Sequence, residues 1–263
     1  MPLPKIGGAS DKEDRGCAMV IGGSEATPGA ALLAGVAALR AGAGKLQIAT
    51  PNDVAIQLGL AVPEAMVIGL PSRAAMRKLA PHLSQADAIL IGPGMDEKAA
   101  TASLVRDVAK RMQVDATLVL DAVAIRWADH LRRGVITPHS GEMADLMDVP
   151  REEVEANALE FAVLASERFG CVVALKGATS FIAAGAEVYR FDGGSVGLAT
   201  SGSGDTLAGV VVGLAARGAD PLTAALWAVW AHGTAGVRLA KRVNRVGFLA
   251  RELLAELPAV LSS

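Results

Sequence analysis

Short runs of Val, Ile, Leu and Ala alternate with longer Ala-rich stretches along most of this chain of 263 residues. The short runs have the length and composition of buried strands, and we expect strands at residues 17–21, 45–49, 65–68, 88–91, 117–120, 135–137 and 171–175. The longer stretches carry helical spacing, and we expect helices at residues 28–41, 72–79, 97–111, 141–147 and 152–168. Strands that alternate with helices build a parallel sheet that is covered on both faces. The pattern therefore predicts an α/β fold with a mostly parallel central sheet.

The last two expected strands break this alternation. Residues 179–184 and 187–191 are separated only by a short Gly-Ala turn, which is typical of neighbouring antiparallel strands. We therefore expect a β-meander at the end of the sheet, followed by helices from residue 206 to residue 257. The sequence has no low-complexity linker and no repeat. We expect a flexible N-terminal segment at residues 1–14 and a single domain at residues 15–263.

Composition and charge disfavour several classes of partner. The net charge is -2 and the Lys and Arg residues are scattered, so we do not expect the protein to bind nucleic acid. Cys17 and Cys171 lie inside apolar runs, as buried free thiols do, which fits a reducing cytoplasm. The first 14 residues lack the apolar core of a signal peptide, and no apolar run is long enough to cross a bilayer. We therefore expect a cytoplasmic protein without a membrane partner.

In an open parallel sheet, ligands bind where the carboxyl ends of strands meet the amino ends of helices. The chain has no GxxxxGK(S/T) loop and no GxGxxG turn after a strand. It also has no CxxC or HExxH metal motif and no GxSxG nucleophile turn. Standard ATPases, dehydrogenases, zinc enzymes and α/β-hydrolases are therefore disfavoured.

The glycine-rich turn before the C-terminal helices is the most informative motif. Gly202, Ser203 and Gly204 lead into Asp205 where a long apolar helix begins. The glycines let a phosphate approach the backbone, and the free N–H groups and dipole of the helix attract an anion. Asp205 is either an ordinary helix cap or a base for a hydroxyl group that is being phosphorylated. The turn by itself does not choose between these two roles.

Two further glycine turns and one histidine loop follow other expected strands. Gly22-Gly23 and Gly92-Pro93-Gly94 are either plain tight turns or places where backbone amides face a ligand. His139 and Glu142 share a loop of the kind on which binding and catalytic residues concentrate. Glu142 could equally cap the helix that follows. We interpret the remaining histidines as surface or packing residues, and these are His82, His130 and His232.

A lysine and an aspartate complete the polar groups at the expected strand ends. Lys176 opens a turn with two hydroxyl groups and several open amides, which suit a phosphate. A solvated hairpin lysine is the alternative. Asp121 directly follows another strand, where it is either a site carboxylate or a helix cap.

Taken together, these loops resemble those of the ADP/ATP-dependent NAD(P)H-hydrate dehydratases, a carbohydrate-kinase-like family with a ribokinase-type fold. The resemblance covers nearly the whole chain, and its motifs are Gly22-Gly23-Ser24, Pro28-Gly29-Ala30, Gly92-Pro93-Gly94, Leu120-Asp121-Ala122, Thr137-Pro138-His139, Gly141-Glu142, Lys176-Gly177-Ala178 and Gly202-Ser203-Gly204-Asp205. It implies a ribokinase-like three-layer α/β/α sandwich. It also implies an enzyme that uses ADP or ATP to dehydrate the S-epimer of hydrated NAD(P)H, releasing AMP or ADP and phosphate.

The resemblance also assigns residues and partners. It implies that Asp205 is the catalytic base and that the hydrated NAD(P)H contacts Ala30, Gly94, His139 and Asp205. It implies that the adenine nucleotide binds to Lys176, Gly177, Ala178, Thr179, Ser180 and Gly204. Mg²⁺ is expected because phosphoryl transfer needs charge neutralisation, although no metal ligand is assigned. A homo-oligomer, by family resemblance a tetramer, and a separate epimerase protein are expected as well.

Three positions depart from the family pattern. Ser140 stands where the family has a proline, Val123 replaces a second aspartate, and Ser195-Val196 replace Asn-Pro. None of these changes removes a residue that is assigned to the chemistry. Two other functions stay open, namely a ribokinase-like kinase for a vitamin or sugar and a non-catalytic adenine-nucleotide-binding protein.

Overall fold

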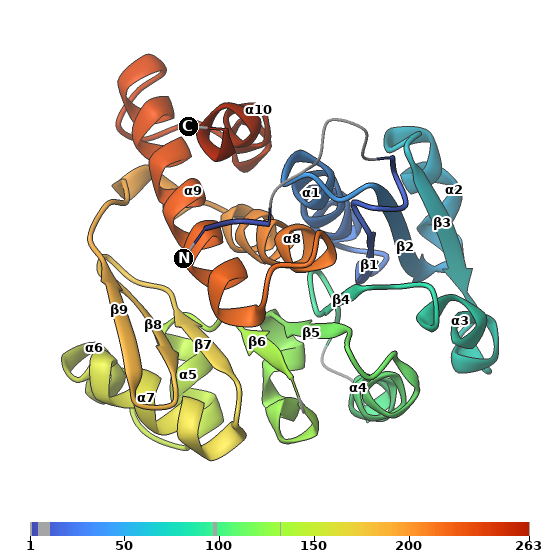
Figure 1. Ribbon diagram of the computed structural model, residues 1–263, viewed down its shortest axis with the longest axis horizontal. Helices are drawn as coiled ribbons and strands as arrows, with labels where there is room; N and C mark the ends of the chain where they lie inside the picture. The colour runs from blue at the N-terminus through green and yellow to red at the C-terminus, as the bar shows by residue number, and fades with distance from the viewer. Residues whose placement is uncertain (1, 5–10, 97–98, 132, 263) are drawn as a thin grey trace.

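The computed structural model describes residues 2–4, 11–96, 99–131 and 133–262, which contain a sheet of nine strands (Figure 1). The strands are β1 (Cys17–Ile21), β2 (Lys45–Pro51), β3 (Ala65–Leu70), β4 (Ala88–Ile91), β5 (Thr117–Leu120), β6 (Gly134–Ile136), β7 (Val172–Leu175), β8 (Ser180–Ala184) and β9 (Glu187–Phe191). Their order in the sheet is β3-β2-β1-β4-β5-β6-β7-β8-β9. Strands β1 to β7 run parallel, whereas β8 and β9 pair antiparallel. The predicted mostly parallel sheet and its closing β-meander are confirmed.

Helices cover both faces of the sheet (Figure 1). The core on one face contains side chains of α1 (Pro28–Arg40), α2 (Asn52–Ala61), α8 (Ser203–Ala216), α9 (Pro221–Arg242) and α10 (Ala250–Leu261). The core on the other face contains side chains of α3 (Ala75–Leu83), α4 (Ala99–Arg111), the 3-10 segment η1 (Ala122–His130), α5 (Ser140–Met147), α6 (Arg151–Ala156) and α7 (Ala158–Phe169). A short 3-10 turn, η2 (Val196–Leu198), lies in the loop before α8. The chain therefore folds as a three-layer α/β/α sandwich.

Strand β1 shows how side chains of the sheet pack into the hydrophobic cores on both faces. Ala18 and Val20 point into the core with α8, and Met19 and Ile21 point into the opposite core. All four side chains are at most 1% exposed. A strand that is buried on both faces reads as a continuous apolar run without alternation. This explains why the central strands are the elements that the sequence predicts best.

The helices differ from the prediction at several places. The pattern does not predict η1 or α2, and in α2 the apolar side chains of Ile56 and Leu60 are 75% and 80% exposed, so they do not mark a buried face. One helix over residues 152–168 is wrong, because the backbone at Asn157 (φ -127°, ψ 39°) leaves helical geometry and separates α6 from α7. The helix expected at 72–79 lies at Ala75–Leu83.

The N-terminal prediction is described only in part. Residues 1 and 5–10 of the expected flexible segment lie outside the described residues, as do residues 97 and 98 of the helix expected at 97–111. Arg217 donates a hydrogen bond to the carbonyl oxygen of Pro4, and Lys45 forms an ion pair with Glu13. The flexibility of this segment stays a prediction.

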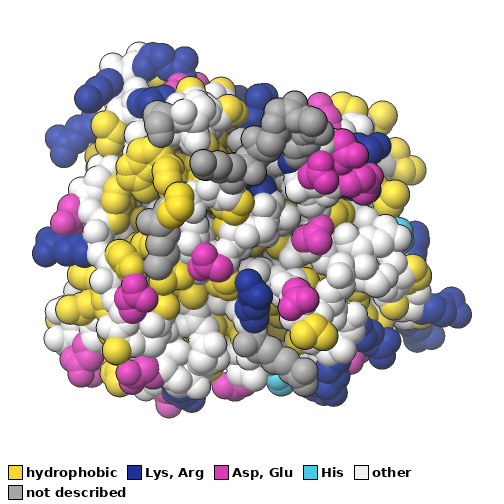
Figure 2. Space-filling view, viewed as in Figure 1, with side chains coloured by type: hydrophobic (Ala, Val, Ile, Leu, Met, Phe, Trp, Pro, Cys, Tyr) yellow, Lys and Arg dark blue, Asp and Glu magenta, His cyan; other side chains and the backbone are white. Residues whose placement is uncertain are grey.

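The surface and the helix lengths bear on two other predictions. On the face seen in Figure 2, the described Lys and Arg side chains lie mostly toward the rim and are interspersed with Asp and Glu. This face therefore presents no broad basic area among the described residues. Within those residues, no helix combines the length and the apolar character that a membrane crossing needs.

The close contact between α1 and α8 places the glycine-rich turn. A Cβ atom at Gly209 would lie 2.3 Å from the carbonyl oxygen of Ala34, and one at Gly213 would lie 2.5 Å from that of Ala38. Only glycine allows the two helices to approach this closely. The start of α8 is thereby held beside the start of α1, at the carboxyl edge of the sheet.

We predict that Gly209→Ala lowers the free energy of unfolding by on the order of 3 kcal/mol, because the new methyl group meets backbone that cannot move aside. Urea denaturation followed by circular dichroism would measure this change. Gly29→Ala is the matched control, because nothing lies within 4 Å of a Cβ atom at that helical position. Equal stability of the two variants would contradict the packing argument.

Candidate active site

The glycine turns after β1 and β4 are joined by hydrogen bonds. Gly23 N donates to the carbonyl oxygen of Pro93 over 2.7 Å, and Thr27 Oγ1 donates to that of Gly94 over 2.9 Å. Gly94 has φ +66°, and a Cβ atom there would lie 2.7 Å from Cβ of Ala30. The structure therefore brings Ala30 and Gly94, two predicted substrate-binding residues, into contact at the start of α1.

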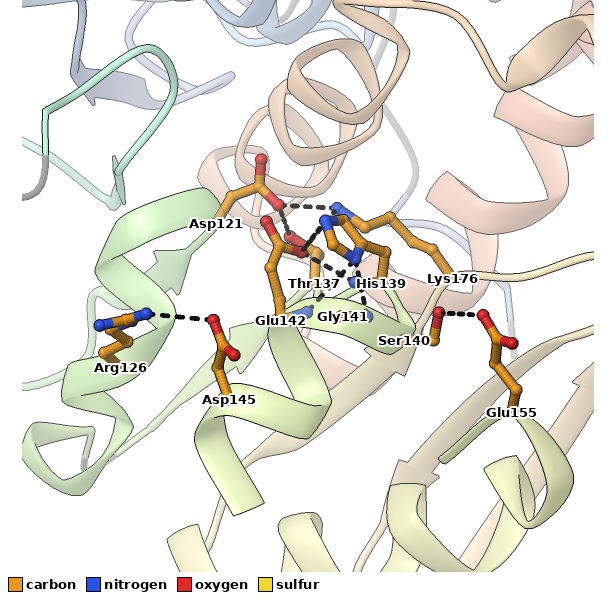
Figure 3. A network of polar contacts seen from close by, with 10 residues as sticks. All are labelled: Asp121, Arg126, Thr137, His139, Ser140, Gly141, Glu142, Asp145, Glu155 and Lys176. Carbon is orange, nitrogen blue, oxygen red and sulfur yellow. Dashed lines mark hydrogen bonds and ion pairs between the residues drawn. The ribbon is translucent and has the colours of Figure 1, made fainter. Parts of the chain in front are cut away.

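The carboxyl ends of β5, β6 and β7 are tied together by one buried carboxylate (Figure 3). Asp121 Oδ1 accepts a hydrogen bond from Thr137 Oγ1 over 2.6 Å and another from Lys176 Nζ over 2.9 Å. The Asp121 side chain is 3% exposed and that of Lys176 is 20% exposed. The Asp121 side chain forms no capping hydrogen bond to η1, and Lys176 is mostly buried, so it is not a solvated hairpin lysine. Both alternative readings from the sequence are therefore wrong.

The residue after Asp121 adopts a backbone conformation that is uncommon for residues other than glycine. Ala122 has φ +50°, in the left-handed region. Such conformations cost on the order of 1–3 kcal/mol and persist where the surrounding structure imposes them. Here the turn redirects the chain from β5 into η1 and leaves the Asp121 carboxylate at the strand end, facing Lys176.

His139 forms the N-terminal cap of α5. Its Nδ1 atom accepts hydrogen bonds from Gly141 N over 3.0 Å and from Glu142 N over 3.3 Å. Glu142 Oε2 in turn accepts from His139 N over 2.8 Å, which completes a capping box. Because Nδ1 accepts, the imidazole presents its Nε2 atom as the remaining polar group. The side chain is 57% exposed, so the ring is fixed and accessible to a ligand.

Lys176 links the His139 loop to the glycine-rich turn. Its Nζ atom lies 3.8 Å from Glu142 Oε2, and a Cβ atom at Gly204 would lie 3.3 Å from it. Burial on its own lowers the pKa of Lys176, but the neighbouring carboxylates of Asp121, Glu142 and Asp205 outweigh burial and raise that pKa. The ammonium group is therefore charged at neutral pH.

Asp205 lies in the first turn of α8 and is not its cap. The cap position is Gly202, with φ +86°, and no side chain caps this helix. Burial raises the pKa of Asp205 to about 6, the charges of Asp121 and Glu142 raise it as well, and Lys176 opposes them. A carboxyl group with a pKa near the working pH is suited to accept a proton and release it again.

The predicted nucleotide-binding turn runs from Lys176 to Ser180. Gly177 and Ala178 are exposed, and Ser180 begins β8. Thr179 Oγ1 donates to Asp192 Oδ1 over 2.7 Å, so its hydroxyl hydrogen already has an acceptor. Lys176 connects this turn to Gly204. The role of these residues in binding a nucleotide stays a prediction.

Two contacts in the site were not predicted from the sequence. One is the Asp121–Lys176 ion pair, for which the position of Asp121 directly after a strand is the only signal. The other joins His232 Nε2 to Ser203 Oγ over 2.9 Å. His232 therefore contacts the glycine-rich turn, and its interpretation as a plain packing residue is incomplete.

The departures from the family pattern have local partners. Ser140, the first residue of α5, donates to Glu155 Oε1 over 3.0 Å, and the same oxygen pairs with Arg151 Nε over 2.7 Å. This bond ties the His139 loop to α6. Ser195 accepts a hydrogen bond from Gly197 N over 3.4 Å and starts η2. Nothing in the structure explains Val123.

The family whose sequence model is described as NAD(P)H-hydrate dehydratase matches residues 18–259 of this chain. The chain belongs to the NAD(P)H-hydrate dehydratase family. An ADP-dependent (S)-NAD(P)H-hydrate dehydratase of Xanthomonas campestris pv. campestris is 49% identical, over 99% of this chain and 92% of that protein. Other curated members of the family are bifunctional NAD(P)H-hydrate repair enzymes, and this chain spans about half of their length.

Solved structures of similar proteins share the fold. A ribokinase-like superfamily protein from Enterococcus faecalis superimposes with a TM-score of 0.88 at 28% identity, covering 99% of this chain and 91% of that one. An ADP/ATP-dependent NAD(P)H-hydrate dehydratase from Bacillus subtilis, co-crystallised with ATP/Mg²⁺, gives a TM-score of 0.85 at 32% identity, covering 99% and 94%. The predicted ribokinase-like fold and dehydratase family are confirmed.

We predict that the pKa of Asp205 moves in opposite directions in two variants of this dehydratase site. Lys176→Met should raise the pKa above about 6, because the ammonium charge lowers it, and Asp121→Asn should lower the pKa, because the Asp121 charge raises it. Titration of the Asp205 carboxyl carbon by NMR measures both values. Asp145→Asn is the control, since Asp145 pairs with Arg126 outside this cluster. Shifts of the same sign in both variants would refute this electrostatic account.

We also predict that Asp205→Asn stabilises the fold at high pH. The folded-state pKa of Asp205, about 6, lies above its ordinary value of 3.8, so the folded state holds the proton more tightly than the unfolded state. The ionised carboxylate therefore lowers stability progressively as the pH rises through this interval, and the full penalty is present above it. Near pH 8 the variant should gain on the order of 2 kcal/mol in the free energy of unfolding, and near pH 4 it should gain less than about 1 kcal/mol. Urea denaturation at both pH values tests this, and an equal gain at both would contradict it.

Proposed function

We propose that this chain is an ADP-dependent (S)-NAD(P)H-hydrate dehydratase that also accepts ATP, and that it releases AMP or ADP together with phosphate. The observation that carries this proposal is the position of Asp205. A carboxyl group with a pKa of about 6 lies in the first turn of α8, beside Lys176 and at a helix N-terminus of the kind that suits an anion. The 49% identical relative from Xanthomonas campestris supports the choice of reaction.

The nucleotide is proposed to bind along the turn from Lys176 to Ser180 with its terminal phosphate at Gly204. Lys176 supplies a charged ammonium group, which Asp121 holds in place over 2.9 Å. Because Gly204 has no side chain, a phosphate oxygen has room between the ammonium group and the first amides of α8. A lysine as a point charge and a helix N-terminus together neutralise phosphate charge as it moves.

The hydrated nicotinamide ring is proposed to lie between the Ala30–Gly94 contact and His139. Ala30 and Gly94 present small surfaces that a flat ring can approach. His139 is held by its own helix through Nδ1, and its Nε2 atom, 3.7 Å from Glu142 Oε2, is proposed to bond a polar group of the substrate. We propose that the ring hydroxyl group then faces Asp205.

Asp205 then handles the proton of the first step. It accepts the proton of the ring hydroxyl group while the hydroxyl oxygen bonds to the terminal phosphorus of the nucleotide and the bond from that phosphorus to AMP breaks. In the second step the electron pair of the ring nitrogen expels the phosphate from the neighbouring carbon. A proton then leaves the next ring carbon to the solvent, and its C–H electron pair forms the ring double bond. Phosphate departs where hydroxide would not, and the dihydropyridine ring is restored. Lys176 and the amides of α8 stabilise the charge on the transferred group.

A Mg²⁺ ion fits the charge balance of this cluster. When ionised, Asp121, Glu142 and Asp205 carry three negative charges around the single positive charge of Lys176. Mg²⁺ usually keeps several waters and binds one or two carboxylates together with substrate phosphates. Among the described residues, no group of three or more His, Cys, Asp or Glu side chains forms a metal site. We propose that the ion enters with the nucleotide, with Asp205 or Glu142 as its protein contact, and that it neutralises phosphate charge.

Cellular setting and assembly are part of the proposal. Burial raises the pKa of Cys17 to about 11 and that of Cys171 to about 12, so both are protonated thiols of low reactivity, and two free buried thiols support the proposal of a reducing cytoplasm. Ile56 and Leu60 of α2 are exposed beside edge strand β3, which favours a homo-oligomer such as a tetramer. Light scattering should report more than one subunit, and a monomer would contradict this part.

Asp205→Asn should lower kcat for hydrate dehydration by about 10²- to 10⁴-fold, the usual loss when a general base is removed. The assay incubates the hydrate of NADH with ADP or ATP and Mg²⁺ and follows the absorbance of the reduced nicotinamide. Asp145→Asn is the control, because its partner Arg126 lies outside the site, and it should keep wild-type turnover.

The same assay separates the two other functions. A vitamin or sugar kinase would leave the hydrate unchanged with both nucleotides and would keep phosphate on its own product. A non-catalytic nucleotide-binding protein would bind ADP by calorimetry without turnover. Wild-type protein that fails to restore the absorbance with either nucleotide would refute the dehydratase proposal.

A further inference from the structure

His232 contacts the glycine-rich turn from the layer of helices behind it. It lies on α9, and its Nε2 atom is 2.9 Å from Oγ of Ser203, the first residue of α8. Ser203 is 4% exposed, so its hydroxyl group has no ready access to water. A buried hydroxyl group needs a hydrogen-bond partner, and His232 is the partner that the structure shows.

The imidazole of His232 is neutral in this position. Burial lowers its pKa to about 4, and the positive charge of Lys176 opposes protonation as well. A neutral imidazole has one donor nitrogen and one acceptor nitrogen, so Nε2 either donates to Ser203 Oγ or accepts from it, depending on the tautomer. In either case the bond restrains the Ser203 Oγ atom and with it the first residue of α8.

The same face of α9 also holds the segment that leads into the turn. A Cβ atom at Gly233 would lie 2.4 Å from the ring of Phe191, and one at Gly236 would lie 2.6 Å from the side chain of Leu198. Phe191 ends β9 and Leu198 ends η2, so α9 contacts the chain before the turn at two points. His232 adds a third contact at Ser203, one residue before Gly204 and two before Asp205.

We infer that His232 is a positioning residue of the active site, which acts through the Ser203 hydroxyl group to hold the Gly204 amide and the Asp205 carboxylate in register with Lys176. Neither His232 nor the Ser203 hydroxyl group is proposed to contact the substrate or the nucleotide. Loss of the bond between them leaves the fold in place but frees the first turn of α8. The catalytic part of this inference rests on the proposed dehydratase function.

A displaced base slows chemistry more than it weakens binding, because a shift of about 1 Å can cost on the order of 10²-fold in rate. His232→Phe keeps a ring and removes the hydrogen bond, so kcat should fall by about 10- to 100-fold while KM for ADP changes by less than about threefold. His232→Gln keeps a polar atom near the position of Nε2 and should recover kcat to within about threefold of wild type. His130→Phe is the matched control on η1 and should match wild type.

A double-mutant cycle tests the route through Ser203. If His232 acts through that hydroxyl group, His232→Phe combined with Ser203→Ala should be no slower than the slower single variant. Additive losses in kcat would overturn the inference, as would wild-type kcat in His232→Phe. A rise in KM for ADP that matches the fall in kcat/KM, with kcat unchanged, would also overturn it.

A second readout does not depend on turnover. Ser203 N donates to the carbonyl oxygen of Thr200 over 3.2 Å, and Thr206 N donates to that of Gly202 over 3.0 Å. Hydrogen exchange at these two amides should accelerate at least about tenfold in His232→Phe and stay unchanged in His130→Phe, because local opening of the turn becomes easier. Unchanged exchange in His232→Phe overturns the inference even if the wild-type enzyme is active. Accelerated exchange in a protein without dehydratase activity supports the positioning role and refutes only the proposed reaction.

Discussion

The ion pair between Asp121 and Lys176 is the interaction on which the site depends. It joins the ends of β5 and β7 across β6, and Thr137 of the chain after β6 donates to the same carboxylate oxygen. A buried carboxylate without a partner is costly, so the three strand ends must stay in register for the pair to form. The pair aims the ammonium group at Gly204, which places the proposed phosphate-binding turn beside Asp205, the proposed base.

The electrostatics of the cluster link function to stability. Burial and like charges raise the pKa of Asp205 to about 6, which prepares it to accept a proton but makes its ionised form unfavourable in the folded protein. Lys176 limits this effect. The close packing of α8 on α1 holds the first turn of α8, and with it this buried carboxyl group, in place. The proposed base thus stands on a helix, α8, whose side chains are mostly buried.

Particular elements show how far the sequence could predict this structure. Strands such as β1 and β4 are predicted with their observed bounds, because burial on both faces leaves continuous apolar runs. The break at Asn157 could not be predicted, since the residues on both sides continue a helical pattern. In the site, the turns at Gly94 and Gly204 and the loop of His139 follow from motifs. The cap that His139 forms and the pairing of Asp121 required coordinates.

The sequence by itself determined the fold class, the family and the loops that line the carboxyl edge of the sheet, because apolar periodicity and glycine turns are local signals. Only the tertiary structure decided which polar groups meet. Lys176 contacts Asp121, which lies 55 residues away in the sequence, and His232 contacts Ser203, which lies 29 residues away. Such contacts depend on strand order and helix packing, and the raised pKa of Asp205 depends on burial. No local pattern of residues encodes these quantities.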